Sequence, residues 1–151
     1  MNAEPVRMRD RTAVDISLFL VRVIVGVIFA AHGSQKLFGA FGGQGLSQVV
    51  EKMGSIGYLV TIGEFFGGLG LIVGFLTHFS AASLIFIMIG AIQMVHGKKG
   101  FFASAGGFEY NLALIGLLLP ILLAGPGRIA IGRLLPLPKS ARTGSPIIVL
   151  E

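Results

Sequence analysis

Four long runs of apolar residues constrain the fold of this chain more than any other feature of its sequence. They cover residues 16–31, 56–76, 79–95 and 112–124. Each run can be extended to the roughly 20 residues that a helix needs to cross a bilayer. Hydrophobic residues make up 54% of the chain and charged residues only 13%, which leaves too little polar surface to coat a water-soluble domain. The sequence therefore predicts an all-α, polytopic membrane protein, a four-transmembrane-helix bundle in the lipid bilayer.

The short connections between these runs predict one membrane domain over residues 15–131, with spans at about 16–36, 56–76, 79–97 and 108–125. An N-terminal segment (1–14) precedes this domain, and a tail (132–151) follows it. Four spans put both ends on one side, which carries Arg7, Arg9, Arg11, Arg128, Arg133, Lys139 and Arg142. The opposite side carries Lys36, Lys52, Lys98 and Lys99. Because cytoplasmic flanks are enriched in Lys and Arg, we predict that both termini are cytoplasmic.

The sequence also contains an internal repeat with an offset of 64 residues. At this offset His32-Gly33 aligns with His96-Gly97, and Gly42-Gly43 aligns with Gly106-Gly107. Coincidences of this kind are less common in membrane helices than coincidences of apolar residues. We therefore predict that the bundle is built from two parallel helix-hairpin repeats, with both His-Gly pairs at the outer face of the membrane.

Glycines at positions 63, 67, 70 and 74 fall on one side of the second predicted helix. A smooth stripe of this kind lets a neighbouring helix approach closely, so we expect another helix to pack there.

The connection between the first two spans contains an amphipathic segment, residues 44–54, with its apolar side chains at helical spacing. Two interpretations stay open for this predicted short helix. It either covers the bundle as a lid at the membrane interface, or it only connects two spans.

Arg22 and Glu64 are ionisable residues that lie deep inside the first and second predicted spans. A lone charge at such a depth is costly, so each of them needs a partner. We therefore predict an intramembrane ion pair between Arg22 and Glu64. Three interpretations stay open: the pair only fastens two helices, it handles protons or substrate, or Arg22 instead extends to the cytoplasmic surface.

Polar and aromatic side chains gather at the predicted outer ends of the helices. They combine hydrogen-bond donors, a carboxylate and aromatic rings, a set that suits the head group of a quinone. We therefore predict a ligand-binding pocket lined by His32, Lys36, Phe38, His96, Phe101, Phe102, Glu109 and Tyr110. Two alternatives stay open: these groups only anchor helix ends among lipid head groups, or the two histidines ligate a haem or a metal ion.

Several classes of function lack support in this sequence. The chain has no cysteine, which excludes thiolate metal sites, iron–sulfur clusters and c-type haem held by its own residues. Walker A, dinucleotide-binding and nucleophile-elbow patterns are also missing. Basic residues beside the spans explain the net charge of +5, so nucleic-acid binding is not expected. We predict no metal site and no intrinsic cofactor, and we leave open whether the chain is an enzyme.

Taken in order, several short motifs resemble the DoxX family of small bacterial membrane proteins. The resemblance covers residues 18–131 and rests on Leu20-x-Arg22, His32-Gly33-x-x-Lys36-Leu37-Phe38-Gly39, Glu64-x-x-Gly67-Gly68, Val95-His96, Gly100-Phe101-Phe102 and Gly107-Phe108-Glu109-Tyr110. It implies a four-helix protein of the bacterial inner membrane. It also implies a subunit associated with a quinone-linked or sulfur-linked oxidoreductase complex.

Three functional hypotheses follow. The chain is a DoxX-like membrane subunit that binds quinone or docks membrane or periplasmic redox proteins at its outer face. Alternatively, it is a membrane anchor or assembly protein without catalysis, or it is a conduit for protons or small solutes. The sequence names neither the substrate nor the partner protein, and a homo-oligomer is compatible with all three hypotheses.

Overall fold

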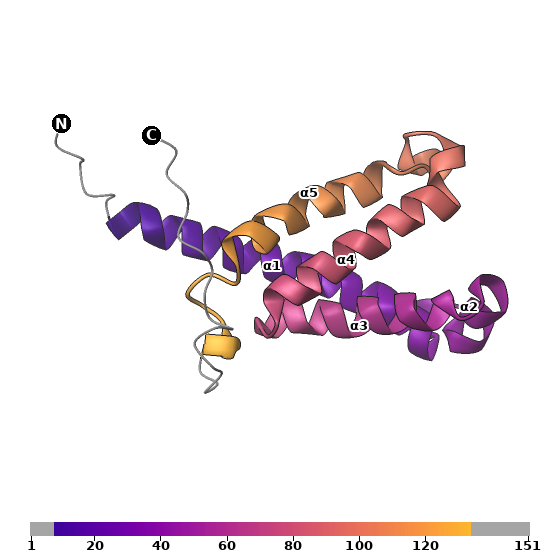
Figure 1. Ribbon diagram of the computed structural model, residues 1–151, viewed down its shortest axis with the longest axis horizontal. Helices are drawn as coiled ribbons and strands as arrows, with labels where there is room; N and C mark the ends of the chain where they lie inside the picture. Colours follow the sequence, from indigo (N-terminus) through magenta and orange to yellow (C-terminus); the bar gives the residue numbers. More distant parts are fainter. Residues whose placement is uncertain (1–7, 134–151) are drawn as a thin grey trace.

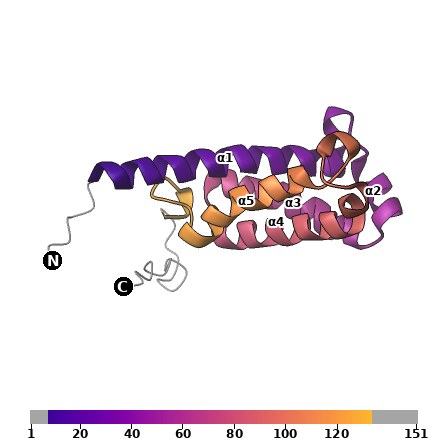
Figure 2. The same cartoon turned by 90° about the horizontal axis from the view of Figure 1, so that it is seen from above.

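The computed structural model describes residues 8–133, so the remainder of the predicted N-terminal segment and tail lies outside the described part of the chain. Within it, four long helices follow the four apolar runs: α1 (Met8–Phe38), α3 (Ile56–Val73), α4 (Thr77–Ala91) and α5 (Glu109–Ala124). The amphipathic segment forms α2 (Gly45–Met53) between α1 and α3. Figures 1 and 2 show the long helices running alternately up and down the bundle. The described residues contain helices and no strands, which confirms the all-α class.

Short helical turns complete the described chain. They are η1 (Ala40–Gly42), the π-helical turn η2 (Ile92–His96), η3 (Gly97–Lys99), η4 (Ala103–Ala105) and η5 (Ile131–Arg133). All but η5 lie at the end of the bundle that carries α2, which we call the α2 end. The opposite end, where α1 begins and η5 follows α5, is called the terminal end (Figure 1).

Helix α1 begins earlier than the sequence predicted. It starts at Met8 rather than near residue 16 and is 31 residues long, which corresponds to about 46 Å. Neither Gly nor Pro occurs before Gly26 within this helix, so no residue of the extension opposes helix formation. The first turns of α1 therefore project beyond the bundle (Figure 2).

Helices α1 and α3 pack together through glycines. A Cβ atom added at Gly26 would lie 2.8 Å from the carbonyl oxygen of Gly68, and one added at Gly33 would overlap the backbone of Phe65. Gly68 in turn faces the backbone of Ala30. Any side chain at these positions would force the two helices apart, so the glycines fix how closely they pack and which residues lie level with each other.

The glycine stripe of α3 faces α4. Cβ atoms added at Gly63 and Gly67 would contact Ile87 and Leu84, which confirms the close approach predicted from the sequence. Between the helices lies a core whose residues are almost inaccessible: Val25, Phe29, Leu71, Ala81, Leu84, Met88, Leu114, Leu118 and Ile121. The core draws on all four long helices and therefore holds them in one bundle.

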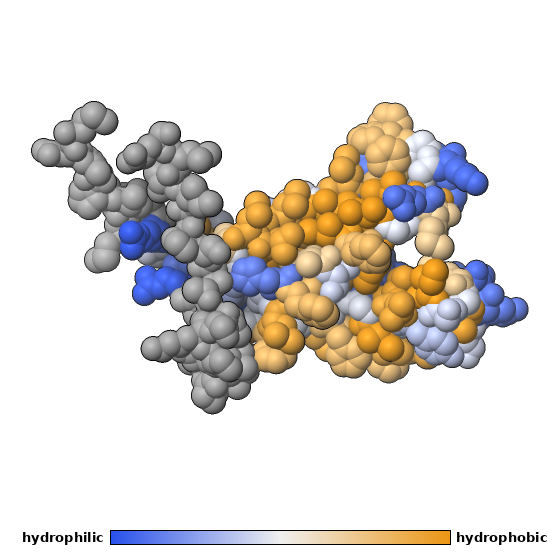
Figure 3. Space-filling view, viewed as in Figure 1, coloured by the Kyte–Doolittle hydropathy of each residue, from blue (hydrophilic) through white to orange (hydrophobic). Residues whose placement is uncertain are grey.

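Apolar side chains also cover much of the outside of the bundle, whereas polar ones gather at its ends (Figure 3). The helical stretches Arg11–Phe38, Ile56–Val73 and Thr77–Lys99 are long and apolar enough to cross a membrane. Helix α5 is equally apolar, but its 16 residues extend only about 24 Å. The protein is thus a membrane protein with several apolar helices, and a fourth crossing stays a prediction.

The predicted repeat also stays a prediction, because its two matching motifs fold differently. His32 and Gly33 belong to the continuous helix α1. His96 instead ends the π-helical turn η2, and Gly97 begins the 3-10 turn η3.

At the terminal end, Arg22 holds the segment after α5 against the bundle. Its side chain is 1% exposed, and its guanidinium donates to the carbonyl oxygens of Pro126 (3.2 Å) and Ile129 (2.7 Å). Gly74 ends α3 with φ +74°, and a Cβ there would collide with this guanidinium. The Gly132 N–H donates to the Gly74 carbonyl at 3.2 Å. Arg22 therefore serves the packing of this end of the protein.

We predict that Gly33→Ala destabilises the protein, because the added methyl group would overlap the backbone of α3 at Phe65. Overpacking of this kind costs about 1 to 3 kcal/mol. The measurement is the free energy of unfolding in detergent micelles. Gly90→Ala in α4 is the matched control, because an added Cβ there meets nothing within 4 Å and alanine favours a helix. Equal stability of the two variants would contradict the close approach of α1 and α3.

Candidate functional site

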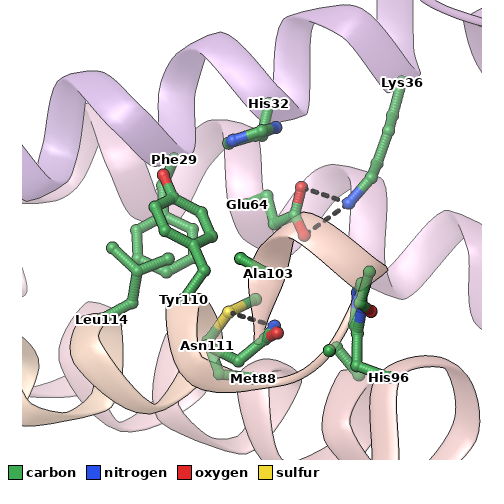
Figure 4. A pocket seen from close by; sticks show the side chains of 13 residues that line it. Phe29, His32, Lys36, Glu64, Met88, His96, Ala103, Tyr110, Asn111 and Leu114 are labelled. Atoms are coloured by element: carbon green, nitrogen blue, oxygen red, sulfur yellow. Dashed lines mark hydrogen bonds and ion pairs between the residues drawn. The ribbon is translucent and has the colours of Figure 1, made fainter. Parts of the chain in front are cut away.

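A pocket of about 310 Å³ lies inside the bundle toward the α2 end. All four long helices and the α4–α5 connection contribute to its wall (Figure 4). Its lining consists of Phe29, His32, Lys36, Glu64, Met88, Ala91, His96, Ala103, Gly106, Gly107, Tyr110, Asn111 and Leu114. This volume is at the lower end of the range of small-molecule sites.

Lys36 and Glu64 form an ion pair on the wall of the pocket. The Lys36 Nζ atom lies 2.5 Å from Glu64 Oε1 and 2.6 Å from Oε2 (Figure 4). The Glu64 side chain is 3% exposed and the Lys36 side chain 31%. An ammonium group has three protons to donate, and the carboxylate accepts two of them in this arrangement. The third remains for an acceptor in the pocket.

This pairing corrects the prediction that Arg22 is the partner of Glu64. Gly33 faces Phe65, so the glycine contact sets Glu64 level with the part of α1 near Gly33. Arg22 lies about 16 Å further along the α1 axis, beyond the reach of its side chain. Lys36 is less than one turn from Gly33 and reaches the carboxylate. Depth estimated for each helix separately could not reveal this register.

The π-helical turn at the end of α4 directs His96 toward the pocket. Met88 and Ala91 of α4 line the pocket, and a regular α-helix would rotate His96 away from that face. A turn with i→i+5 hydrogen bonds holds more residues than an α-turn, so each residue rotates less about the helix axis. The turn Ile92–His96 thereby returns His96 to the face of Met88.

A hydrogen bond also fixes the protonation of one His96 nitrogen. Nδ1 lies 2.7 Å from the carbonyl oxygen of Gly106. A carbonyl can only accept, so Nδ1 carries the proton in this contact. The neutral ring then offers the Nε2 lone pair, and the protonated ring offers an Nε2 donor.

Polar groups of α5 complete the pocket. The rings of Tyr110 and His32 meet edge to face, with centroids 6.2 Å apart. Asn111 is 5% exposed, and its amide donates to the Met88 sulfur at 3.4 Å, a weak interaction. The pocket therefore combines an ion pair, two imidazoles, a phenol and an amide with the apolar side chains of Phe29 and Leu114.

Other predicted residues lie away from the pocket. The Glu109 carboxylate accepts a hydrogen bond from the Ala103 N–H at 2.8 Å and so closes the loop before α5. Phe38 packs on Phe65, and Phe101 packs on Phe102 and Phe108. The exposed fractions of Phe38, Phe101 and Phe102 are 67%, 47% and 66%. These residues belong to the surface of the α2 end, so their assignment to the pocket is corrected.

Sequence reasoning placed His32, Lys36, His96 and Tyr110 together, and the structure brings all of them to the pocket. It missed Phe29, Met88, Asn111 and the role of Glu64 as the carboxylate of the pocket. One signal was available for Phe29, which lies one helical turn before His32 and two turns before Lys36 on one face of α1. Met88 and Asn111 meet through the packing of α4 on α5, which residue spacing within one helix does not reveal.

We predict energetic coupling between Lys36 and Glu64. Lys36→Met should cost about 3 to 5 kcal/mol of unfolding free energy, because it leaves the buried Glu64 carboxylate without a partner. Glu64→Gln should cost less, because the Lys36 side chain is 31% exposed and can be solvated. The double variant should cost less than the sum of the two. The control cycle pairs Arg22→Leu with Glu64→Gln, which should be additive within about 0.5 kcal/mol. Additive behaviour of Lys36 and Glu64 in the same micelles would contradict the ion pair.

Comparison with known proteins agrees with these features. Residues 17–97 match the DoxX family. The chain is 31% identical over 124 residues to "Inner membrane protein YqjF" of Escherichia coli (strain K12), an alignment that covers 80% of this chain and 93% of that protein. It is 33% identical over 106 residues to "Putative oxidoreductase CatD" of Bacillus subtilis (strain 168), with 66% of this chain and 74% of that protein covered. No solved structure matches the chain. The chain is therefore a member of the DoxX family of membrane proteins.

Proposed function

We propose that this protein binds the head group of a quinone in the pocket at the α2 end, as the membrane subunit of an oxidoreductase assembly. The observation that carries the proposal is the convergence of Lys36, Glu64, His96, Tyr110 and Asn111 on one pocket. Anchoring residues would be scattered around the bundle and directed at lipid head groups. A pocket with a few directed polar groups and apolar walls is typical of small-molecule sites.

The lining groups match the chemistry of a quinone ring. Its carbonyl oxygens need hydrogen-bond donors, which Lys36 Nζ and the Tyr110 hydroxyl supply. Its flat face needs apolar or aromatic neighbours, which Phe29 and Leu114 supply. Reduction of the ring also consumes protons, and His96 and the Lys36–Glu64 pair are groups that exchange protons. The name of the Bacillus subtilis relative supports an association with redox chemistry.

The proposal includes four membrane crossings with the α2 end outside and both termini in the cytoplasm. Helix α5 is about 24 Å long, compared with a hydrocarbon core of about 30 Å. Thinning of the bilayer around the protein and extension by the flanking loops can accommodate a difference of this size. The basic residues near the termini favour the same orientation.

The chain has no cysteine, so single cysteines test this topology cleanly. Ser47 on α2 and Ser104 in the α4–α5 connection are exposed. We expect Ser47→Cys and Ser104→Cys to react with a membrane-impermeant maleimide in intact cells, and Ser145→Cys to react only after permeabilisation. Labelling of Ser145→Cys alone in intact cells would show that the orientation is the opposite of the one proposed. Labelling of both Ser104→Cys and Ser145→Cys would show that α5 does not cross.

Binding of a short-tailed benzoquinone to protein in lipid nanodiscs tests the pocket. We expect Tyr110→Phe and His96→Gln each to weaken binding about tenfold. Tyr110→Phe removes a hydrogen bond to the ligand worth roughly 1.4 kcal/mol, and His96→Gln removes the Nε2 donor that the protonated ring offers. The matched control is His78→Gln, which alters an exposed histidine in the first turn of α4 at the opposite end. Equal binding by all three variants and the original protein would reject the pocket as the quinone site.

A role as an anchor or assembly protein is the second candidate. The observation that favours it is that Glu109 and the aromatic residues at the α2 end are used in loop closure and surface packing. Complex yield and turnover separate the two candidates. If the protein only assembles a complex, His96→Gln lowers the amount of complex and leaves turnover per complex unchanged.

A further inference from the structure

A second hollow lies beside the pocket, on the side of α1 that faces away from α3. It has a volume of about 350 Å³ and is lined by Val27, Ile28, Ala31 and Gln35 of α1, by Phe41 of η1, and by two residues that also line the pocket. We call it the lateral groove. We infer that it holds the hydrocarbon tail of the quinone and that the ligand enters sideways from the bilayer between α1 and α5. This inference rests on the proposed function.

The two residues shared by the pocket and the lateral groove are His32 and Tyr110. Their rings lie edge to face at 6.2 Å with an interplanar angle of 62°. They stand side by side at one edge of the pocket in Figure 4, His32 on α1 and Tyr110 on α5. The pair therefore separates the pocket, whose lining includes Lys36 and Glu64, from a groove on the outside of the bundle whose lining has no Lys, Arg, Asp or Glu.

The surfaces of α1 explain why the two spaces differ. Phe29, His32 and Lys36 follow one face of the helix and line the pocket. Val27, Ile28 and Ala31 follow the adjacent face and line the lateral groove. Val27 is 52% exposed and Phe41 80% exposed, so in a membrane protein of this kind their side chains meet lipid. The groove extends about 12 Å along α1, from Val27 to Gln35.

The loop before α5 forms the wall of the pocket on one side. Ala103, Gly106 and Gly107 of this loop form part of the wall. The loop is held by the bond of His96 to Gly106, by the bond of Ala103 to Glu109, and by the bond of Gly107 N–H to the Phe102 carbonyl (2.9 Å). Opening this side would break several hydrogen bonds together.

The lateral side has no comparable restraint. Within the part of the chain that the structure describes, neither the His32 ring nor the Tyr110 hydroxyl has a hydrogen-bond partner. Rotation of either side chain costs little more than its ring contact, which is worth about 1 kcal/mol. The route from the bilayer is therefore the easier one, and a ligand that uses it must be soluble in lipid.

Together the two spaces fit an amphiphile with one polar ring and one apolar chain. The ring would lie against Lys36 and His96, and the chain would pass between His32 and Tyr110 to Val27 and Phe41. Because the chain would leave lipid and not water, it would add affinity through van der Waals contacts with the groove, whereas a ring without a chain fills only the pocket.

The test compares one benzoquinone ring with and without a ten-carbon tail, at equal mole fraction in nanodisc lipid. We expect the tailed compound to bind at least tenfold more tightly to the original protein. Val27→Trp should remove that advantage by filling the lateral groove, while the tail-less ring binds as before. The matched control is Leu20→Trp, because Leu20 is 51% exposed on the same helix and lies outside the groove.

A tailed quinone with a diazirine at its tail end gives a second measurement. We expect photolabelling within the segment 27–41 that the unlabelled tailed quinone suppresses. Labelling spread evenly over the lipid-facing helices would overturn the inference, as would equal effects of Val27→Trp and Leu20→Trp. If neither compound binds the original protein, the proposed function fails as well. If the tailed and the tail-less compounds bind equally, the pocket is retained as the quinone site and the inference about the lateral groove is rejected.

Discussion

The close approach of α1 and α3 determines most of what the α2 end can do. Gly26, Gly33 and Gly68 carry no side chains, so the backbones of the two helices approach closely at these positions and fix which residues lie level. Once this register is fixed, Glu64 lies within reach of Lys36 and out of reach of Arg22. The ion pair is thus a consequence of helix packing and not an independent attraction that brought the helices together. This order of cause matters because association between membrane helices depends on packing far more than on the removal of apolar surface from water.

The buried Arg22 and the half-buried Lys36 are paired in different ways, and the difference separates a structural role from a chemical one. Arg22 donates to backbone carbonyls of the segment after α5, which are fixed dipoles without protons to exchange. Lys36 donates to a carboxylate beside an open space, where a change in protonation or a ligand can alter the balance of charge. A buried ion pair adds little net stability compared with apolar packing of the same volume. The position of this pair next to a pocket therefore supports the proposed function more than a role in folding.

Composition and periodicity predicted the all-α class, the positions of the long helices and the glycine stripe, because these depend on residues near one another in sequence. They also predicted that His32, Lys36, His96 and Tyr110 belong together. They did not predict which cation pairs with Glu64. The wrong assignment of Arg22 to Glu64 came from estimating depth along each helix alone, whereas the axial register of two helices depends on contacts such as Gly33 with Phe65. The π-helical turn that directs His96 likewise has no pattern in the sequence, since i→i+4 and i→i+5 turns form from the same residues.

The divergence between the two hairpins gives the pocket its shape. The His-Gly pair of α1 stays within a straight helix, where Gly33 serves the contact with α3 and leaves His32 at the edge of the pocket. The His-Gly pair after α4 instead marks the end of regular helix, where the change of turn frees the chain to form the loop over the pocket. The two glutamates at this end also have different roles. Glu64 is the carboxylate of the pocket, and Glu109 accepts the hydrogen bond that closes the loop. The α2 end therefore carries one charged pocket, bounded by the loop before α5 on one side and by the His32–Tyr110 pair on the side toward lipid, an arrangement that suits the proposed lipid-soluble ligand.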